Sequence, residues 1–262
     1  MKGFMVDAGG EVVTREDVFS VPVPDPAKRH YPIPHSYLIG TVQDIFDNKF
    51  VKNPEFNYTL KKEQYALAGF DKKTGIPGQM FGLFTYDTGD PQFGFSVGFR
   101  NSYDQSLAAG VVGGANPFVC SNLCFSGDSF KIHRKNTLNA IHELYAMVMD
   151  NAWSMFRDYQ KMVKEFGLMS RMPVSQSEGF ETLGLMYGEG MIKQRQFAAA
   201  VDAWREPPQV DWAPRNALSL YNAVTEGTKK TNVADVVDDL SKTHKFFRQR
   251  FNVPEIIELE AV

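Results

Sequence analysis

Two clusters of polar and basic side chains follow strand-like segments in the middle of the chain. The first supplies a guanidinium, an amide, a phenol and a carboxylate, from Arg100, Asn101, Tyr103 and Asp104. The second supplies three cations and an imidazole, from Lys131, His133, Arg134 and Lys135. Lysine and arginine bind phosphate groups, and aromatic rings stack on unpaired bases. If both clusters meet at one end of a sheet, we expect them to hold an anionic ligand, and we favour single-stranded nucleic acid.

The predicted nucleic-acid-binding set draws on both clusters and consists of Arg100, Asn101, Tyr103, Lys131, Arg134 and Lys135. Tyr103 or Phe130 is the ring expected to stack on a base. Asp104 and His133 form a possible polar or metal site beside this set. A simpler interpretation stays open, in which Arg100 pairs with Asp104 in an ordinary strand-end turn and Asn101 bonds to its own backbone.

Two further functions are compatible with the same residues. An enzyme acting on a phosphorylated or nucleotide substrate would place Asp104, Asn101 and His133 around a divalent ion, with His133 as general base. An oligomeric virion or anti-defence protein without catalysis would instead use a proline-rich arm and helical tail for contacts with partners. The sequence does not decide whether the chain is an enzyme.

The common catalytic and nucleotide-binding motifs are missing from the chain. It contains no phosphate-binding P-loop, no dinucleotide-binding glycine fingerprint, no zinc-protease motif and no hydrolase elbow. Cys120 and Cys124 lack the second ligand pair of a structural zinc site, so we expect free thiols, no resident metal and no cofactor. The net charge of −3 excludes a protein coated in positive charge, so contact with nucleic acid requires a local basic patch.

Three strings in this region resemble a phage- and plasmid-type protein family known only as domain-of-unknown-function family 932. They are GFRNSYD at 98–104, FVCSNLCFSG at 118–127 and RKNT at 134–137, and the resemblance extends to PIPH at 32–35 and YNAVTEG at 221–227. The resemblance implies a setting in phages or mobile elements and says little about activity.

Two positions depart from the pattern of that family. Tyr103 stands where the family commonly has histidine, and Asn136 stands where it usually has histidine. The resemblance therefore implies that any chemistry carried by those histidines is lost here. In the YNAVTEG string, spacing brings Asn222, Thr225 and Glu226 together on a helix, and an exposed polar face is the simpler expectation.

The elements that must position these clusters are strands followed by a long helix. Apolar residues alternate with glycine and serine over 93–99, which predicts a strand with one buried face. Further strands are expected at 57–60, 63–70 and 80–86, joined by turns at Lys61-Lys62 and 71–78. The glycine-rich run 110–116 is expected to be a mobile turn. The predicted fold class is α+β, an antiparallel meander backed by a long helix, with the phage single-strand annealing proteins as a fold-level analogy.

The helical part of the chain begins at Thr137. An apolar stripe predicts a helix of about eight turns to Gly167, and shorter helices follow to Phe251. The expected domains are an extended proline-rich arm at 1–36, an α+β core at 37–170, a helical subdomain at 171–254 and a loose acidic tail at 255–262.

The chain has no apolar run long enough for a membrane span and no signal-peptide pattern at its start. We therefore expect a soluble protein of the cytoplasm, the host cytoplasm if a phage encodes it. The long helix exceeds the width of a small sheet, and the arm can reach a neighbouring molecule, so we expect a homo-oligomer without membrane partners.

Overall fold

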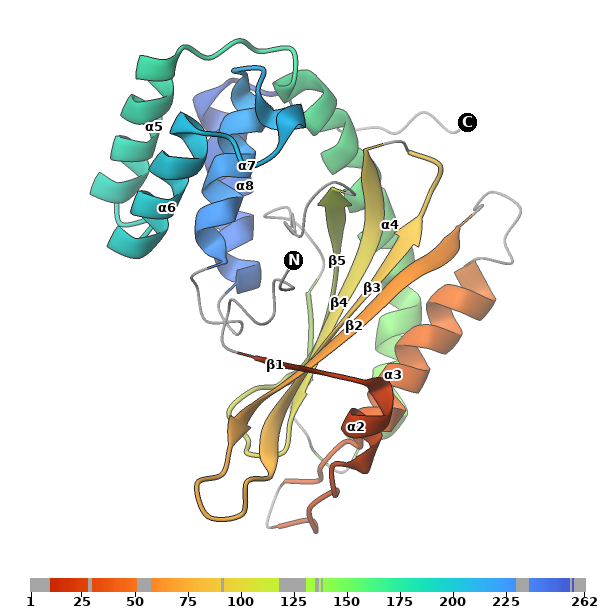
Figure 1. Cartoon of the computed structure of the whole chain (residues 1–262). Helices are drawn as coiled ribbons and strands as arrows, with labels where there is room; N and C mark the ends of the chain where they lie inside the picture. Colours follow the sequence, from red (N-terminus) through yellow and green to blue (C-terminus); the bar gives the residue numbers. More distant parts are fainter. Residues whose placement is uncertain are drawn as a thin grey trace. The chain divides into compact units, whose positions relative to one another are not determined.

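The computed structural model describes residues 10–27, 30–50, 58–90, 92–117, 131–134, 137, 139–229, 236–254 and 256. It confirms the predicted α+β fold, because an antiparallel meander is followed by a long helix and then by shorter helices (Figure 1). The chain divides into two compact units. The sheet unit comprises Met1–Gly113 and Phe130–Phe156, and the helical unit comprises Gly114–Ser129 and Arg157–Val262.

In chain order the elements are β1 (Glu11–Val13), α2 (Arg15–Ser20), α3 (His35–Gln43), the π-helix η1 (Asp44–Phe50), β2 (Thr59–Phe70), β3 (Pro77–Asp87), β4 (Phe93–Ser102), β5 (Ala109–Pro117), β6 (Lys131–Arg134), α4 (Ala140–Met169), α5 (Gln176–Gly188), α6 (Gln194–Arg205), the 3-10 helix η2 (Val210–Trp212), α7 (Ala217–Thr228) and α8 (Val236–Arg250). The unit boundary falls within α4, between Phe156 and Arg157, whereas the sequence suggested a boundary at 170/171.

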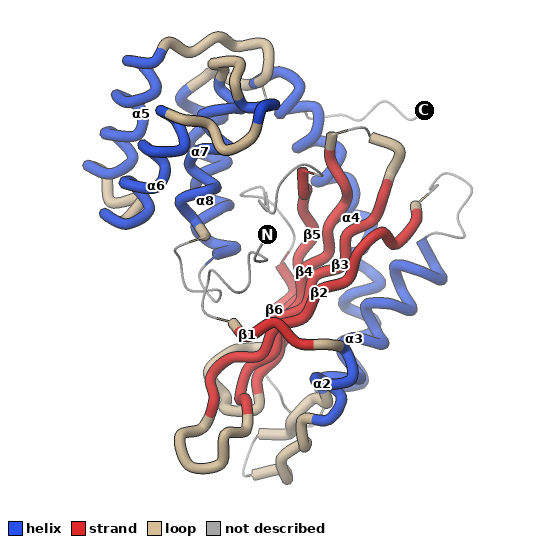
Figure 2. Tube along the Cα trace, in the orientation of Figure 1, coloured by secondary structure: helices blue, strands red, loops and turns tan. Residues whose placement is uncertain are grey.

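The six strands of the described sheet lie side by side in chain order (Figure 2). Strands β2 and β3 are joined by the turn 71–76, and β4 and β5 by the turn 103–108. Because β3 pairs antiparallel with both β2 and β4, these two turns lie at the same end of the sheet. We call this the hairpin end.

One face of the sheet is covered by helices that precede the meander in the chain and by the long helix that follows it (Figure 1). The alternating apolar residues of 93–99 are buried, as predicted. The ring of Phe95 lies 5.8 Å from that of Phe46 in η1 and 5.6 Å from that of Phe156 in α4. On the opposite face of β4, Ser96 is fully buried and lies 3.3 Å from the hydroxyl of Thr85. Strand β4 is therefore an interior strand on both faces.

Two predicted turns are wrong, and both segments are strand. Lys61-Lys62 lies inside β2, at a register shift opposite β3, so one bulged strand replaces the two expected strands. The glycine-rich run forms β5, not a mobile turn. A Cβ atom on Gly113 would lie 2.5 Å from the Cβ of Met155 in α4. Glycine is therefore required there for close approach of the helix to the sheet.

The N-terminal segment is partly docked on the sheet unit. Thr14 caps α2 through a reciprocal capping box with Asp17. Val18, Val21 and Ile33 are buried. The N-terminal segment is thus not only a free arm, because Val18 and Val21 before its prolines and Ile33 between Pro32 and Pro34 contribute to the core.

The helical unit has an aromatic core with a buried ionic cluster. The Tyr221 ring of α7 packs against Phe166 of α4 and Phe247 of α8. The carboxylate of Glu165 lies 2.6 Å from His244 Nε2 and 3.1 Å from Arg248 Nε.

Within α7, Asn222 and Thr225 are buried. The expected exposed polar face of the YNAVTEG helix is therefore wrong at these two positions. The hydroxyl of Thr225 donates to the Asn222 carbonyl, which satisfies this polar group inside the helix itself.

Candidate nucleic-acid interface

The hairpin end gathers basic positions from three separate stretches of the chain. Arg100 pairs with Phe81 close to the end of β4. Strand β6 pairs with the first residues of β5, Lys131 opposite Val112 and Arg134 opposite Ala109. Since β5 lies between β4 and β6, the backbones of the two predicted clusters are two strands apart, about 10 Å.

The turn 71–76 adds two lysines that the sequence analysis treated only as turn residues. Lys72 and Lys73 are exposed and have no ion-pair partner within the described residues. Asp71 is turned toward the backbone, because its Oδ1 accepts from the N–H groups of Lys73 and Thr74 at 2.9 and 2.8 Å. The hydrogen bond from the Thr74 backbone, with that from Lys73, lowers the pKa of Asp71. The turn is therefore fixed internally while both ammonium groups face solvent.

The turn 103–108 is fixed in a similar way. Asp104 accepts from the Ser106 backbone N–H at 2.9 Å and from the Ser106 hydroxyl. Gln79 Nε2 donates to Ser106 Oγ at 2.9 Å and lies 3.4 Å from Asp104 Oδ2. A Cβ atom on Gly78 would lie 2.8 Å from the Cβ of Asp104, so the two hairpins approach each other closely. Asp104 is therefore part of the contact between the turn 103–108 and the start of β3.

Basic residues outnumber acidic residues at this end of the sheet. Within 68–79, 99–110 and 131–134 the basic positions are Lys72, Lys73, Arg100, Lys131 and Arg134, and the acidic positions are Asp71 and Asp104. Arg100 is half-buried and takes part in an interaction within the chain, so the exposed lysines are the cations most accessible to a ligand.

Asn101 and Tyr103 have buried roles. Asn101 Nδ2 lies 2.6 Å from the carbonyl oxygen of Ile33, to which it donates, and 3.1 Å from His35 Nδ1. The Tyr103 ring stacks on the His35 ring with centroids 3.8 Å apart, and its hydroxyl accepts from the His35 backbone N–H. Tyr103 therefore stacks on a histidine of the same chain. The 98–104 and 32–35 strings meet at this contact.

These contacts define the protonation of His35. The Ile33 carbonyl oxygen can only accept, so the Asn101 atom beside it is the amide nitrogen Nδ2. The same Nδ2 lies beside His35 Nδ1, and it can only donate there too. Nδ1 must then accept, and the imidazole is neutral with its proton on Nε2. Burial agrees with this assignment, because it lowers the pKa of His35 to about 3. His35 Nε2 has no hydrogen-bond partner among the described residues.

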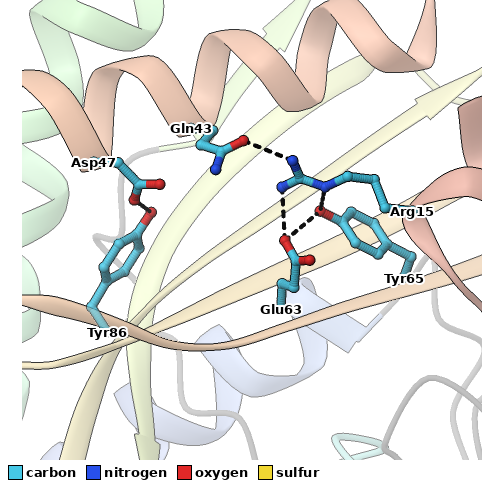
Figure 3. A network of polar contacts seen from close by, with 6 residues as sticks. All are labelled: Arg15, Gln43, Asp47, Glu63, Tyr65 and Tyr86. Carbon is cyan, nitrogen blue, oxygen red and sulfur yellow. Dashed lines mark hydrogen bonds and ion pairs between the residues drawn. The ribbon is translucent and has the colours of Figure 1, made fainter.

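A second polar network ties the N-terminal segment to the sheet (Figure 3). Arg15 donates to the Tyr65 hydroxyl, to Gln43 Oε1 and to Glu63 Oε2, at 3.0, 2.9 and 2.7 Å. The Tyr65 hydroxyl in turn donates to Glu63, and burial raises the pKa of this phenol. Each of the three guanidinium nitrogens of Arg15 has a partner, so the network acts as a clamp between α2, α3 and β2.

The predicted polar or metal site is not assembled by the described residues. Asn101 faces His35, whereas Asp104 faces Ser106 and Gln79. The structure describes only the backbone of His133. Over the described ranges, no group of three His, Cys, Asp or Glu residues is close enough to hold a metal ion.

The remaining predicted residues are placed only in part. The structure describes Lys131 and Arg134 by their backbone, while Lys135, Asn136 and the 118–130 segment with its two cysteines lie outside the described residues.

One candidate residue was not predicted from the sequence. Phe70, the last residue of β2, is 45% exposed and lies close in sequence to Lys72 and Lys73. The sequence signal was an aromatic residue directly before the turn 71–76, which carries Lys72 and Lys73.

Comparison with protein-family models, with curated proteins and with solved structures found no match. Among the described residues, no helix is long and apolar enough to cross a membrane.

Proposed function

We propose that this chain binds single-stranded DNA through the hairpin end of its sheet, as a nucleic-acid-handling protein of recombination or annealing type. The observation that supports the proposal most is the excess of basic over acidic positions there, with exposed Lys72 and Lys73. A chain with a net charge of −3 needs such a local patch to attract a phosphate backbone. The phage or mobile-element setting is supported by the string resemblance alone.

The test is the salt dependence of oligonucleotide binding by the full chain. A fluorescently labelled oligo(dT) is titrated at several salt concentrations, and log Kobs is plotted against log [salt]. We expect the Lys72→Ala/Lys73→Ala variant to bind more weakly, with a slope less steep by about 1.4, because each phosphate contact on a single strand contributes about 0.7. Arg134→Ala tests the β6 contribution in the same assay.

The matched control is Lys61→Ala/Lys62→Ala. It removes another pair of adjacent exposed lysines, but from within β2 and toward the end opposite the hairpin end, where Lys61 pairs with Asp87. The control should retain the wild-type slope. Absence of wild-type binding at low salt would refute the proposal, and equal losses in the two double variants would show that the hairpin end is not the site.

A second candidate function is assembly through the N-terminal segment. Val12, Phe19 and Val23 are large apolar residues in this segment that are about half exposed. Exposed apolar surface of this kind marks a site of protein contact where it is contiguous, and another copy of the chain is the partner tested here. If they form one, Phe19→Ser should lower the mass measured by light scattering. An unchanged mass would remove this candidate.

A further inference from the structure

The tip of the β2–β3 hairpin combines exposed apolar and cationic side chains. Phe70 and Ile76 are 45% and 40% exposed, and they flank the exposed Lys72 and Lys73 in sequence. A ring that offers an open face beside cations is the combination found in proteins that bind single strands without sequence preference.

The tip is also rigid enough to present this combination. The Asp71 N–H donates to the Ile76 carbonyl at 2.9 Å, and the Gly75 N–H donates to the Asp71 carbonyl at 2.9 Å. Gly75 has a φ of +69°, a left-handed conformation that glycine adopts without strain. Because the turn is already ordered, little conformational entropy is lost when a ligand binds to it.

We infer that Phe70 is a base-stacking residue, and that the hairpin tip selects unpaired DNA over duplex. This inference rests on the proposed function and adds its selectivity. A base in a duplex is covered on both faces by its neighbours, so only a single strand offers Phe70 a free base face, while Lys72 and Lys73 contact the adjoining phosphates. Ile76 supplies the apolar flank of the same contact.

The experiment measures binding of the full chain to oligo(dT) and to a duplex of equal length. Phe70→Ala should weaken binding to the single strand by between about 5- and 150-fold, the effect of one lost stacking contact. Its salt slope and duplex binding should stay unchanged, because no cation is removed. Phe70→Trp should restore affinity, and binding should quench the added tryptophan emission.

The matched control is Tyr187→Ala, which removes another aromatic side chain that is 45% exposed, from α5 of the helical unit. It should leave binding unchanged. Wild-type affinity of Phe70→Ala would overturn the stacking role while leaving the proposed function intact, whereas failure of the wild type to bind oligo(dT) would refute the function itself. A lower mass of Phe70→Ala in the absence of DNA would show that the tip contacts a second copy, and would overturn the inference as well.

Discussion

Replacing His35 should remove a large part of the pH dependence of stability of the sheet unit. In the unfolded chain a histidine titrates near pH 6.5, and burial lowers the pKa of folded His35 to about 3. Between these values the unfolded state binds one more proton than the folded state, so stability is complete above pH 6.5 and is lost as the pH falls toward 3. The limiting slope is about 1.4 kcal/mol per pH unit.

The expected magnitude is about 2 kcal/mol between pH 7 and pH 5. Urea unfolding at both pH values gives the loss for the wild type, to which carboxylates also contribute. His35→Gln should lose about 2 kcal/mol less than the wild type over this range. Absolute stability at pH 7 does not enter the comparison, so a general cost of the substitution does not obscure the result.

Two additional measurements make the result specific. His142 is exposed on α4, and His142→Gln controls for the loss of any imidazole. Amide hydrogen exchange in β4 separates opening of the sheet unit from opening of the helical unit. If wild type and His35→Gln lose the same stability from pH 7 to pH 5, then His35 is not a buried neutral imidazole, and the assigned tautomer is wrong.

Two further predictions concern packing. Glu165→Ala should lower the free energy of unfolding by about 3 kcal/mol, because it leaves His244 and Arg248 in the helical unit without their shared carboxylate. Urea unfolding followed by tryptophan fluorescence measures this loss. A loss below about 1 kcal/mol would contradict a buried ionic cluster. Gly113→Ala should lower the free energy of unfolding by about 1 to 3 kcal/mol, because the new Cβ atom forces α4 away from β5. Gly184→Ala is the control, because a Cβ atom there meets nothing within 4 Å and should not destabilise the protein. Equal effects of the two substitutions would argue against the close approach of α4 to β5.

The sequence predicted elements with strong periodicity and failed where a residue type has two structural uses. Alternation over 93–99 predicted the buried face of β4, because side chains along a strand alternate strictly. The glycines of 110–116 were interpreted as a turn, although glycine also marks a strand against which a helix packs closely, as at Gly113. Local pattern does not distinguish these uses, because the distinguishing helix residue is Met155, more than forty positions later.

The candidate site was harder to predict, because its side chains depend on long-range contacts. Tyr103 has the type and position of a base-stacking residue, yet its ring is covered by His35, which is 68 positions earlier in the chain. Phe70 was interpreted only as the end of a strand. Its exposure follows from its position at the tip of a hairpin, which becomes evident only once the register of β2 and β3 is known.

The hairpin end also explains how an acidic chain can present a basic surface. Asp71 and Asp104 are the acidic side chains in its turns, and both direct carboxylate oxygens toward donors of their own turns. These carboxylates stabilise the turns without pairing with Lys72 or Lys73, whose ammonium groups stay exposed. Replacing either aspartate by asparagine would remove a nearby negative charge while keeping an acceptor for the turn. If the hairpin end binds phosphates, such a variant should bind single strands more tightly at low salt, and this gain should fall as salt screens the charges.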